Sequence, residues 1–380
     1  MSSKGTAKGK TRRFFDYTLL FVVLFLLMFG LVMLYSVSSY DANITFGRSD
    51  YYLKKQIQAT VLGIVMMLVV MLVDYHIWER FAIVFYVVSA ILILLVLTPL
   101  GIEANGARRW LNLGLSLQPA EVAKLGMIIF SASLVVKMGK KLNSLKGFVF
   151  TVAWSVPICL MVYLITDNLS SAIIIFGIVL MMVFVATPNY KGYILVLALI
   201  FAMAALIVFL VSKGIITEES SYRIGRIKAW LDPEAYSSTT AFQTLQALYA
   251  IGSGGVFGKG LGQSMQKQFI PEAQNDMIFA IICEELGLFG AISVIVLFLI
   301  LVWRLVMIAN NAPDAFGAML VVGALAHISI QVVLNIAVVT NSIPNTGISL
   351  PFISYGGSSV VFLLIEIGLV LSVARGIRLD

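Results

Sequence analysis

Four acidic residues lie close together in the stretch FIPEAQNDMIFAIICEELG, residues 269–287: Glu272, Asp276, Glu284 and Glu285. Pro271 suits the first turn of a helix, which predicts that Glu272 and Asp276 share one helix face. The helix dipole would favour acids at that position. A carboxylate there could act as a general base, couple proton movement in a transporter or bind a cation. The residues alone leave these three chemistries open.

Glu284 and Glu285 need another explanation, because they lie deeper in an apolar run that continues to Ile308. The helix dipole no longer helps at that depth. Ionisable groups inside a membrane are costly, so each requires a partner or a water-filled cavity. We therefore expect this segment to border a polar cleft with Asp276 at its rim.

A second group of polar residues lies in NGARRWLNLGLSLQPAEVAKLG, residues 105–126. Arg108 and Arg109 are expected on a loop, with Trp110 beside them. Guanidinium groups match phosphate oxygens in a bidentate manner, which favours a receptor for phosphate or diphosphate. The same side chains could instead anchor the loop to lipid headgroups, and this alternative stays open.

Glu121 and Lys124 follow in the same stretch at i and i+3, just inside a membrane span. A Glu–Lys pair at this spacing can neutralise itself on one helix face. The pair is then either an internal salt bridge that holds two helices together or a direct contact to substrate. The sequence does not decide between them.

A third group is NSIPNTGISLPFISYGGSS, residues 341–359, in which prolines and glycines exclude a regular helix. Broken backbone at membrane depth is tolerated where it lines protein or a cavity, so we expect a re-entrant loop. His327, Gln331 and Asn335 precede it at i, i+4 and i+8. This spacing favours interhelical hydrogen bonds over a metal site, and a zinc site is not expected.

The elements that position these groups are membrane helices. The 380 residues are 60% hydrophobic and 12% charged, with a mean hydropathy of +0.99, which excludes a soluble domain with one core. A spanning helix needs ~20 mainly apolar residues. The predicted fold is an all-α integral membrane protein with about ten transmembrane helices. They are placed at 18–39, 57–73, 81–98, 119–138, 148–166, 169–187, 192–212, 277–308, 318–340 and 357–374.

Basic residues predict the orientation. If the N-terminus is cytoplasmic, the tails and inner loops hold more than half of the 26 Lys and Arg residues, and the positive-inside rule places both termini inside. We expect a basic cytoplasmic tail at 1–13, a retained signal anchor after it and one polytopic domain over 14–380. The net charge of +7 then reflects anchoring to anionic lipid, and no nucleic-acid partner is expected. Cys159 and Cys283 both lie in membrane runs, which argues against a disulfide framework.

One loop, at 213–276 between the seventh and eighth spans, is much longer than the others. Loops of this length inside a compact architecture are usually functional. The piece SSYRIGRIKAWLDPEAY has near-helical apolar spacing with Arg223 beside it, which predicts a short amphipathic helix. A second helical stretch then runs into a glycine cluster and Lys267. Glycines there allow close approach to a ligand.

In this order and with these gaps, the motifs NGARRW, QPAEVAKL, FIPEAQNDMIFAIICEELG and TGISLPFISYGGSS resemble the SEDS family of bacterial envelope proteins, FtsW, RodA and SpoVE. The resemblance covers nearly the whole chain and is closer to the division and sporulation members than to the elongation members. It implies a peptidoglycan glycosyltransferase that polymerises lipid II at the outer face of the bacterial cytoplasmic membrane. It also implies a class B penicillin-binding protein as transpeptidase partner, together with division proteins.

The resemblance places the essential catalytic acid on Asp276 and makes Glu121 with Lys124 a functionally sensitive pair. Family members often have His-Thr before that acid, whereas this chain has Gln274 and Asn275, so no role of the histidine transfers. The implied reaction is an inverting displacement with a lipid diphosphate leaving group. Candidate groups that bind the substrate or this leaving group are Arg108, Arg109, Trp110, Glu121, Lys124, Arg223 and Lys267.

The metal and the cofactor stay open, with Mg²⁺ or Mn²⁺ as the divalent cations that such a reaction could use. Three other functions also stay open. A lipid II flippase would need polar groups that continue to the inner face. An elongation polymerase differs only in its subfamily, and a scaffold would only recruit the crosslinking partner.

Overall fold

The structure is a computed structural model. It describes residues 16–104, 106–112, 116–188, 190–213, 215 and 222–377. The predicted basic tail at 1–13 lies outside the described residues. A small part of the long loop, at 216–221, lies outside them as well.

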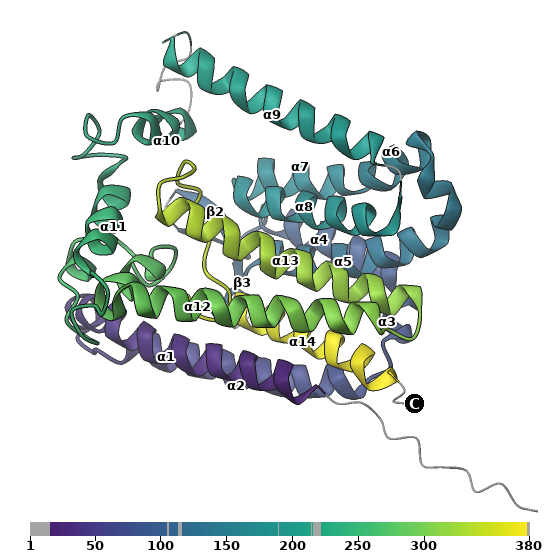
Figure 1. The fold of residues 1–380 in the computed structure, drawn as a ribbon, viewed down its shortest axis with the longest axis horizontal. Coiled ribbons are helices and arrows are strands. Elements are labelled where there is room, and N and C mark those ends of the chain that lie inside the picture. Colours follow the sequence, from purple (N-terminus) through teal and green to yellow (C-terminus); the bar gives the residue numbers. More distant parts are fainter. Residues whose placement is uncertain are drawn as a thin grey trace, which may run out of the picture.

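The described chain is a bundle of helices with one small sheet (Figure 1). Its longer helices are α1 (Tyr17–Phe46), α2 (Tyr51–Leu72), α5 (Pro119–Met138), α8 (Leu169–Ala186), α9 (Lys191–Ser212), α12 (Ile278–Asn310), α13 (Ala315–Val339) and α14 (Gly357–Gly376). Its shorter helices are α3 (His76–Arg80), α4 (Ala82–Leu95), η1 (Gly139–Asn143), α6 (Leu145–Ala153), α7 (Ser155–Ile165), α10 (Tyr222–Leu231), α11 (Phe242–Ser253) and η3 (Gln266–Gln268). An antiparallel sheet, which the sequence did not predict, consists of β1 (Gly101–Ala104), β2 (Ala107–Asn112) and β3 (Ser116–Leu117).

The prediction of a multi-pass all-α membrane protein is confirmed. Within the described residues, 9 helical segments are long and apolar enough to cross a membrane. The span predicted at 81–98 is the shorter apolar helix α4. The span predicted at 148–166 is one such segment, in which α6 and α7 meet at Trp154.

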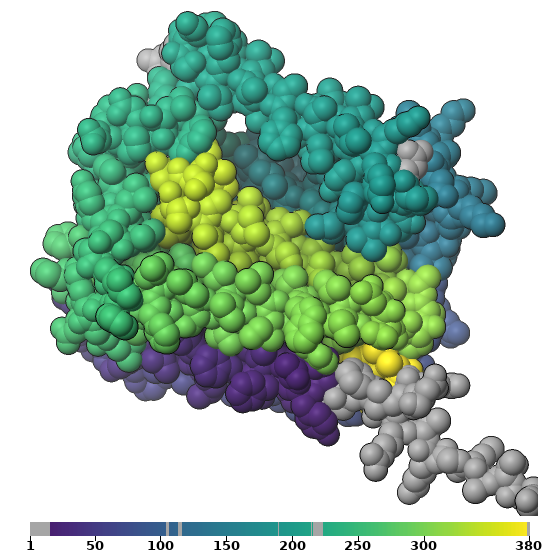
Figure 2. Space-filling model, viewed as in Figure 1, coloured from purple at the N-terminus to yellow at the C-terminus, as the bar shows by residue number. Residues whose placement is uncertain are grey.

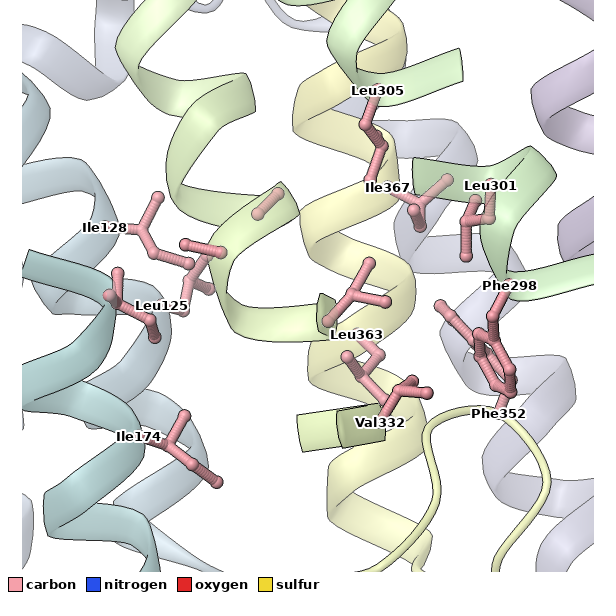
Figure 3. Close-up of a cluster of buried hydrophobic side chains, with 14 of the residues drawn as sticks. Leu125, Ile128, Ile174, Phe298, Leu301, Leu305, Val332, Phe352, Leu363 and Ile367 are labelled. Carbon is pink, nitrogen blue, oxygen red and sulfur yellow. The ribbon is translucent and has the colours of Figure 1, made fainter. Parts of the chain in front are cut away.

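The buried core lies between α5, α8, α12, α13 and α14. Close packing is aided by small residues: a Cβ at Gly368 of α14 would lie 2.7 Å from the carbonyl oxygen of Met67 on α2. Small residues let membrane helices approach closely, which favours this crossing. Figure 3 shows part of the core with Leu125, Ile128, Ile174, Phe298, Leu301, Leu305, Val332, Phe352, Leu363 and Ile367.

Two polar contacts between α1 and α12 mark levels along the bundle. Arg304 donates to Asp16 at 2.6 Å near one end, and Ser36 donates to Glu285 at 2.8 Å near the other. On each helix the two contacts are about 20 residues apart, or roughly 30 Å at the helical rise. That separation is about the thickness of a bilayer's hydrocarbon core, so the two contacts are spaced as its two boundaries are.

Asp276 lies near the level of the second contact. Asn335 lies 20 residues beyond Ala315, the first residue of α13, which is roughly 30 Å along that helix, and its side chain bonds to the carbonyl oxygen of Asp276. This end of the bundle also carries α10 and α11 and is called the α11 end below (Figure 1). The opposite end, with α3 and η1, is called the α3 end.

The helix predicted to begin at Pro271 is wrong. Residues 271–277 form turns, and Glu272 has a φ of +49°, which a helical residue does not adopt. Glu272 and Asp276 therefore do not share a helix face. An irregular turn presents Asp276 instead, which leaves its carboxylate to be positioned by other segments.

The segment between α13 and α14 has irregular backbone, as predicted from its prolines and glycines. Asn341, Gly347 and Phe352 have positive φ values. Its carbonyl groups accept hydrogen bonds from side chains, such as that of Gln56, which donates to the carbonyl oxygen of Ser354 at 3.4 Å. Irregular backbone near the membrane is stable only with such partners.

Helix α9 stands apart from the bundle. Its buried residues are Gly192 and Val211, one near each end. It packs against α6 at the α3 end and against α10 at the other. Figure 2 shows an opening between the α9–α10 part of the chain, in teal, and the rest of the molecule.

Candidate active site

Asp276 is half-buried in the turn before α12. Its Oδ1 accepts a hydrogen bond from Nε2 of Gln243 on α11 at 3.2 Å. The same nitrogen donates to the carbonyl oxygen of Pro271 at 3.1 Å, so Gln243 joins α11 to both ends of the turn. A Cβ built at Gly347 would lie 3.8 Å from Oδ2 of Asp276. Three separate segments thus meet at this carboxylate.

The surroundings of Asp276 raise the pKa of its carboxyl above the value that aspartate has in water. Burial raises the pKa of Asp276 to about 6, and the negative charge of Glu272 acts in the same direction. Its own backbone N–H, the charge of Arg226 and the hydrogen bond from Gln243 lower the pKa without cancelling the rise. Asp276 can therefore exchange a proton close to neutral pH.

Asn335 of α13 fixes the backbone around Asp276. It is fully buried, and its Nδ2 donates to the carbonyl oxygens of Asp276 at 2.8 Å and Ile348 at 2.6 Å. Asn345 extends the same connection, because its Nδ2 donates to Oε1 of Gln243 at 3.0 Å. The irregular segment before α14 and the Asp276 turn are thus held against one another.

Arg226 of α10 reaches the same place. Its Nη1 donates to the carbonyl oxygen of Asn345 at 3.0 Å, and Trp230, one turn later, donates to that of Asn341 at 3.0 Å. The predicted amphipathic helix therefore exists as α10, and the side that carries Arg226 and Trp230 contacts the irregular segment. Arg226 is the described cation whose charge lowers the pKa of Asp276.

Glu121 and Lys124 form a buried pair on α5 at 2.8 Å. Lys124 also donates to Oε1 of Gln331 on α13 at 3.4 Å, and Nε2 of His327 lies 2.9 Å from the same oxygen. His327 pairs in turn with Glu366 of α14 at 2.8 Å. The Glu–Lys pair is thus a salt bridge inside a larger network. The expectation of interhelical hydrogen bonds from the His327 face is confirmed.

This buried network is connected to the walls of the site. Nε2 of Gln331 donates to the carbonyl oxygen of Ser349 at 3.0 Å, one turn of α13 away from Asn335. Oε2 of Glu121 and Oδ1 of Asn335 are buried oxygens without a partner in the described structure. Buried acceptors normally have a donor, so these two atoms can accept a hydrogen bond from a ligand or a water molecule.

Arg109 and Arg223 come together although they are far apart in sequence. Arg109 donates to the carbonyl oxygens of Thr166 and Asp167 at 3.3 and 3.1 Å. Arg223 pairs with the Asp167 carboxylate and donates to the hydroxyl of Tyr163 at 2.9 Å. Two guanidinium groups on one carboxylate form a cationic group that suits an oxyanion.

Arg108 and Trp110 lie on β2 beside this pair. Arg108 is exposed and lies 3.4 Å from the carboxylate of Glu103. Trp110 is half-buried and pairs with Ile102 across the sheet. The sheet therefore gives the arginine motif a fixed backbone, which a loop would not provide.

Glu284 and Glu285 of α12 form a separate cluster with Lys259 and Lys267 of the long loop. Lys259 pairs with Glu284 at 2.7 Å and Lys267 with Glu285 at 3.4 Å, and both acids are fully buried. Ser264 bonds to Glu284 as well. The partner that these acids require is thus supplied by the glycine-rich part of the long loop. The polar cleft expected beside this segment is not what surrounds Glu284 and Glu285: their polar partners are protein side chains.

The glycines of that loop allow this contact. A Cβ at Gly258 would lie 2.2 Å from the carbonyl oxygen of Glu285, and one at Gly254 would lie 2.0 Å from that of Cys283. Helix α12 kinks at Gly287, which has a φ of +67°. Backbone N–H groups of Lys259 and Gly260 bond to the carbonyl oxygens freed near the kink, both at 2.9 Å.

No three His, Cys, Asp or Glu side chains of the described residues gather in a set that could hold a metal ion. The turn contains two acids, Asp276 and Glu272. A protein site that binds a divalent cation by itself supplies more ligands than two carboxylates offer. The described residues therefore do not form a complete metal site.

Three residues that position Asp276 carry no functional signal in the sequence: Gln243, Asn345 and Arg226. Gln243 lies in a helix of ordinary composition, and Asn345 lies in a loop, so neither carries a periodic signal. Arg226 lies in the predicted amphipathic helix, whose spacing gives no sign of a contact with the acid. Sequence spacing could not have found them, because their contacts join α10, α11 and the segment before α14.

The chain was compared with known proteins. The family model for FtsW, RodA and SpoVE, described as "Cell cycle protein", matches residues 17–378. Stage V sporulation protein E of Bacillus subtilis is 39% identical over 364 residues, covering 95% of this chain and 97% of the relative. A protein named "Probable peptidoglycan glycosyltransferase FtsW" of Trichlorobacter lovleyi is 38% identical over 368 residues, covering 96% and 94%.

Solved structures agree with these relatives. A chain from the work titled "Structural coordination of polymerization and crosslinking by a peptidoglycan synthase complex" superposes with a TM-score of 0.76 at 28% identity. It covers 96% of this chain and 99% of that one. The rod shape determining protein RodA of Thermus thermophilus superposes with a TM-score of 0.66 at 27% identity, covering 96% and 98%. The chain therefore belongs to the FtsW, RodA and SpoVE family of cell cycle proteins, the SEDS family.

Proposed function

We propose that this protein is a peptidoglycan glycosyltransferase that polymerises lipid II into glycan strands. The observation that carries the proposal is Asp276: a half-buried carboxylate with a pKa of about 6, held by Gln243 and Asn335 at the α11 end. Relatives named peptidoglycan glycosyltransferase over nearly the full length support the same activity.

In the proposed reaction, Asp276 accepts the proton of the acceptor sugar hydroxyl. The hydroxyl oxygen forms a bond to the anomeric carbon of the growing chain from the face opposite the diphosphate. The bond from that carbon to the diphosphate oxygen breaks, so the configuration inverts. A positioned base contributes ~10²–10⁴-fold to the rate. Asp276 then releases the proton to the outside solution.

The departing lipid diphosphate needs cationic partners. Arg109 and Arg223, which both contact Asp167, form the pair of guanidinium groups that best suits two phosphate groups. Arg108, on the same sheet as Arg109, is a further cation. Trp110 lies on that sheet too. Lys124, paired with Glu121, bonds to Gln331, which in turn holds the segment before α14. Lys267 pairs with Glu285 and so fixes the long loop on α12.

The level of the acid suits a substrate held by a lipid. Asp276 is hydrogen-bonded to Asn335, roughly 30 Å along α13 from Ala315, which is about the thickness of the hydrocarbon core. A prenyl chain in the bilayer would hold its diphosphate and its sugars near this end of the core, within reach of Asp276. The opening beside α9 offers such a lipid a lateral entrance (Figure 2).

The proposed location is the bacterial cytoplasmic membrane, with both termini cytoplasmic. The α3 end carries Arg80, Lys137, Lys140, Lys141 and Lys146, as the positive-inside rule requires for the cytoplasmic side. The α11 end, with Asp276, then faces outward, where lipid II is consumed. The tail 1–13 and the polytopic domain 14–380 would follow the same orientation.

A class B penicillin-binding protein is the proposed partner. The similar chain of known structure comes from a complex whose title joins polymerization with crosslinking, which supports a transpeptidase beside the polymerase. The relatives include both a sporulation protein and FtsW proteins, and we propose a role in division, with division proteins as further partners. An elongation role like that of RodA is the alternative.

The experiment that tests the activity uses the purified protein in vesicles that contain lipid II. Glycan strands longer than one disaccharide unit, separated by gel electrophoresis, are the expected product. Translocation of lipid II without polymer would identify a flippase and contradict the proposal. The flippase is disfavoured because Glu366 is paired with His327 inside the buried network, so its carboxylate is not open to a passing headgroup.

A further inference from the structure

A pocket at the α3 end of the bundle has no part in the proposed reaction. It lies where η1 and α6 meet the first turn of α9, and it has a volume of about 330 Å³. That volume falls within the range of about 300–1,000 Å³ of pockets that hold small molecules. Its lining consists of Leu142, Asn143, Ser144, Leu145, Phe148, Lys191, Gly192 and Leu195.

The pocket is amphipathic. Leu145, Phe148 and Leu195 supply apolar walls, whereas Asn143 and Lys191 lie at the ends of their elements, where polar groups meet the membrane surface. The contact between Thr187 and Asn143, at 2.9 Å, ties the end of α8 to this place. A ligand that fits must have an apolar body and a polar head.

The segments that build the pocket carry charge of one sign. Lys191 lines it, other exposed lysines lie on the adjoining parts of α5, η1 and α6, and the sequence contains no acid between Glu121 and Asp167 or between Asp167 and Glu218. Both segments that build the pocket therefore lack acidic residues of their own. The exposed lysines are Lys137, Lys140, Lys141, Lys146 and Lys191.

The pocket persists because α9 touches the bundle only near its ends. Gly192 brings α9 close to α6: a Cβ there would lie 2.9 Å from the ring of Phe148. Beyond that contact, α9 buries no residue until Val211. A gap between two helices in a membrane does not stay empty, and lipid chains are the material available to fill it.

We propose that this pocket binds an anionic phospholipid of the cytoplasmic leaflet. Its acyl chains lie against Leu145, Phe148 and Leu195, and its phosphate lies among Lys140, Lys141 and Lys191. Basic pockets between membrane helices on the cytoplasmic side bind phosphate headgroups in this manner. The choice of leaflet rests on the proposed orientation, whereas the pocket itself does not depend on the proposed reaction.

The bound lipid would fix the N-terminal end of α9, and the C-terminal end of α9 leads to the active site. Helix α9 continues towards α10, and α10 carries Arg223 and Arg226. With few protein contacts along its length, α9 depends on what packs at its two ends. The lipid therefore stabilises the part of the molecule that frames the opening beside α9.

The test measures lipid binding and needs no activity. The full-length protein, purified in detergent, is titrated with dioleoylphosphatidylglycerol or dioleoylphosphatidylcholine, and bound lipids are counted by native mass spectrometry. We expect the wild type to prefer phosphatidylglycerol. The variant K140Q/K141Q/K191Q should lose affinity for it by about fivefold per lysine. The variant R48Q/K54Q/K55Q removes the same charge at the α11 end and should keep the wild-type affinity.

A second pair of variants leaves the charge unchanged. Leu195→Trp fills the pocket and should lower binding of phosphatidylglycerol at least tenfold, whereas Ile194→Trp, at the neighbouring exposed position, should not. Equal losses in the two charge variants, or wild-type binding by Leu195→Trp, would overturn the proposal. Displacement of the lipid by inorganic phosphate alone would also overturn it, because that result describes an anion site without a lipid pocket.

Discussion

Asp276 and Glu285 lie nine positions apart in the sequence, yet their surroundings differ. Glu285 is fully buried and accepts hydrogen bonds from Ser36 at 2.7 and 2.8 Å, with Lys267 at 3.4 Å. Asp276 is half-buried, receives a side-chain hydrogen bond from Gln243 and has its nearest acid, Glu272, raising its pKa. One acid is fully compensated, and the other is left able to take up a proton.

The comparison separates two uses of buried charge. A buried carboxylate that has a cation and several hydrogen-bond donors is stable as an anion. Removing either the acid or the cation leaves the remaining charge unpaired in an apolar environment. A carboxylate that is desolvated without a close cation has a raised pKa and can act as a base near neutral pH. Substitutions at Asp276 should therefore act on the reaction, whereas substitutions at Glu285 should act on stability.

Asp276→Asn removes the proposed base and keeps the size of the side chain. Polymerisation of lipid II should fall by at least ~10²-fold, since that is the lower value for a positioned base. The melting temperature should stay within a few degrees of the wild type, because no ion pair is lost. A polymerisation rate near that of the wild type would show that Asp276 is not the base.

Glu285→Ala should act on stability. It leaves Lys267 near the membrane boundary without its acid, and breaking a buried pair costs ~3–5 kcal/mol. Thermal unfolding in detergent should reveal this loss. The double variant E285M/K267M should recover most of it, because an apolar pair of similar volume replaces the charges. Glu272→Gln, at an exposed acid, is the matched control and should unfold like the wild type.

Gln243→Met removes the side-chain donor that holds Asp276 but leaves the acid in place. The turnover rate should fall about tenfold, as expected for losing one hydrogen bond to a charged group. That hydrogen bond lowers the pKa of Asp276, so the acid limb of the pH–rate profile should move to higher pH. An unchanged profile would mean that Gln243 only stabilises α11.

The pH dependence of the wild type gives the smallest effect. Because Asp276 must be ionised to act as a base, activity should fall as the pH drops through about 6. The folded pKa is raised above 3.8, so the protonated acid stabilises the fold at low pH and this contribution is lost as pH rises through about 6.

Glu272→Gln should move the acid limb of the pH–rate profile to lower pH by a few tenths of a unit, because it removes a negative charge that repels the Asp276 carboxylate. A shift to higher pH would contradict the assignment.

Much of the architecture follows from the sequence. Apolar runs of about 20 residues predict spans because a helix must cross a fixed hydrocarbon thickness and satisfy its own backbone. The helix α10 and the irregular segment before α14 were predicted for similar reasons, since amphipathic spacing and clustered Pro and Gly act locally. The helix at Pro271 was wrong, because tertiary contacts of the turn outweighed its local preference.

The sequence by itself determined which residues needed an explanation: Asp276, Glu121 with Lys124, the arginines and the two deep acids. Only the tertiary structure decided which of these acids is paired. Lys259 and Lys267 reach Glu284 and Glu285 through a loop with positive φ angles at its glycines, and Gln243 reaches Asp276 from another helix. Such contacts have no period in the sequence, because they join segments that meet only when the helices have packed.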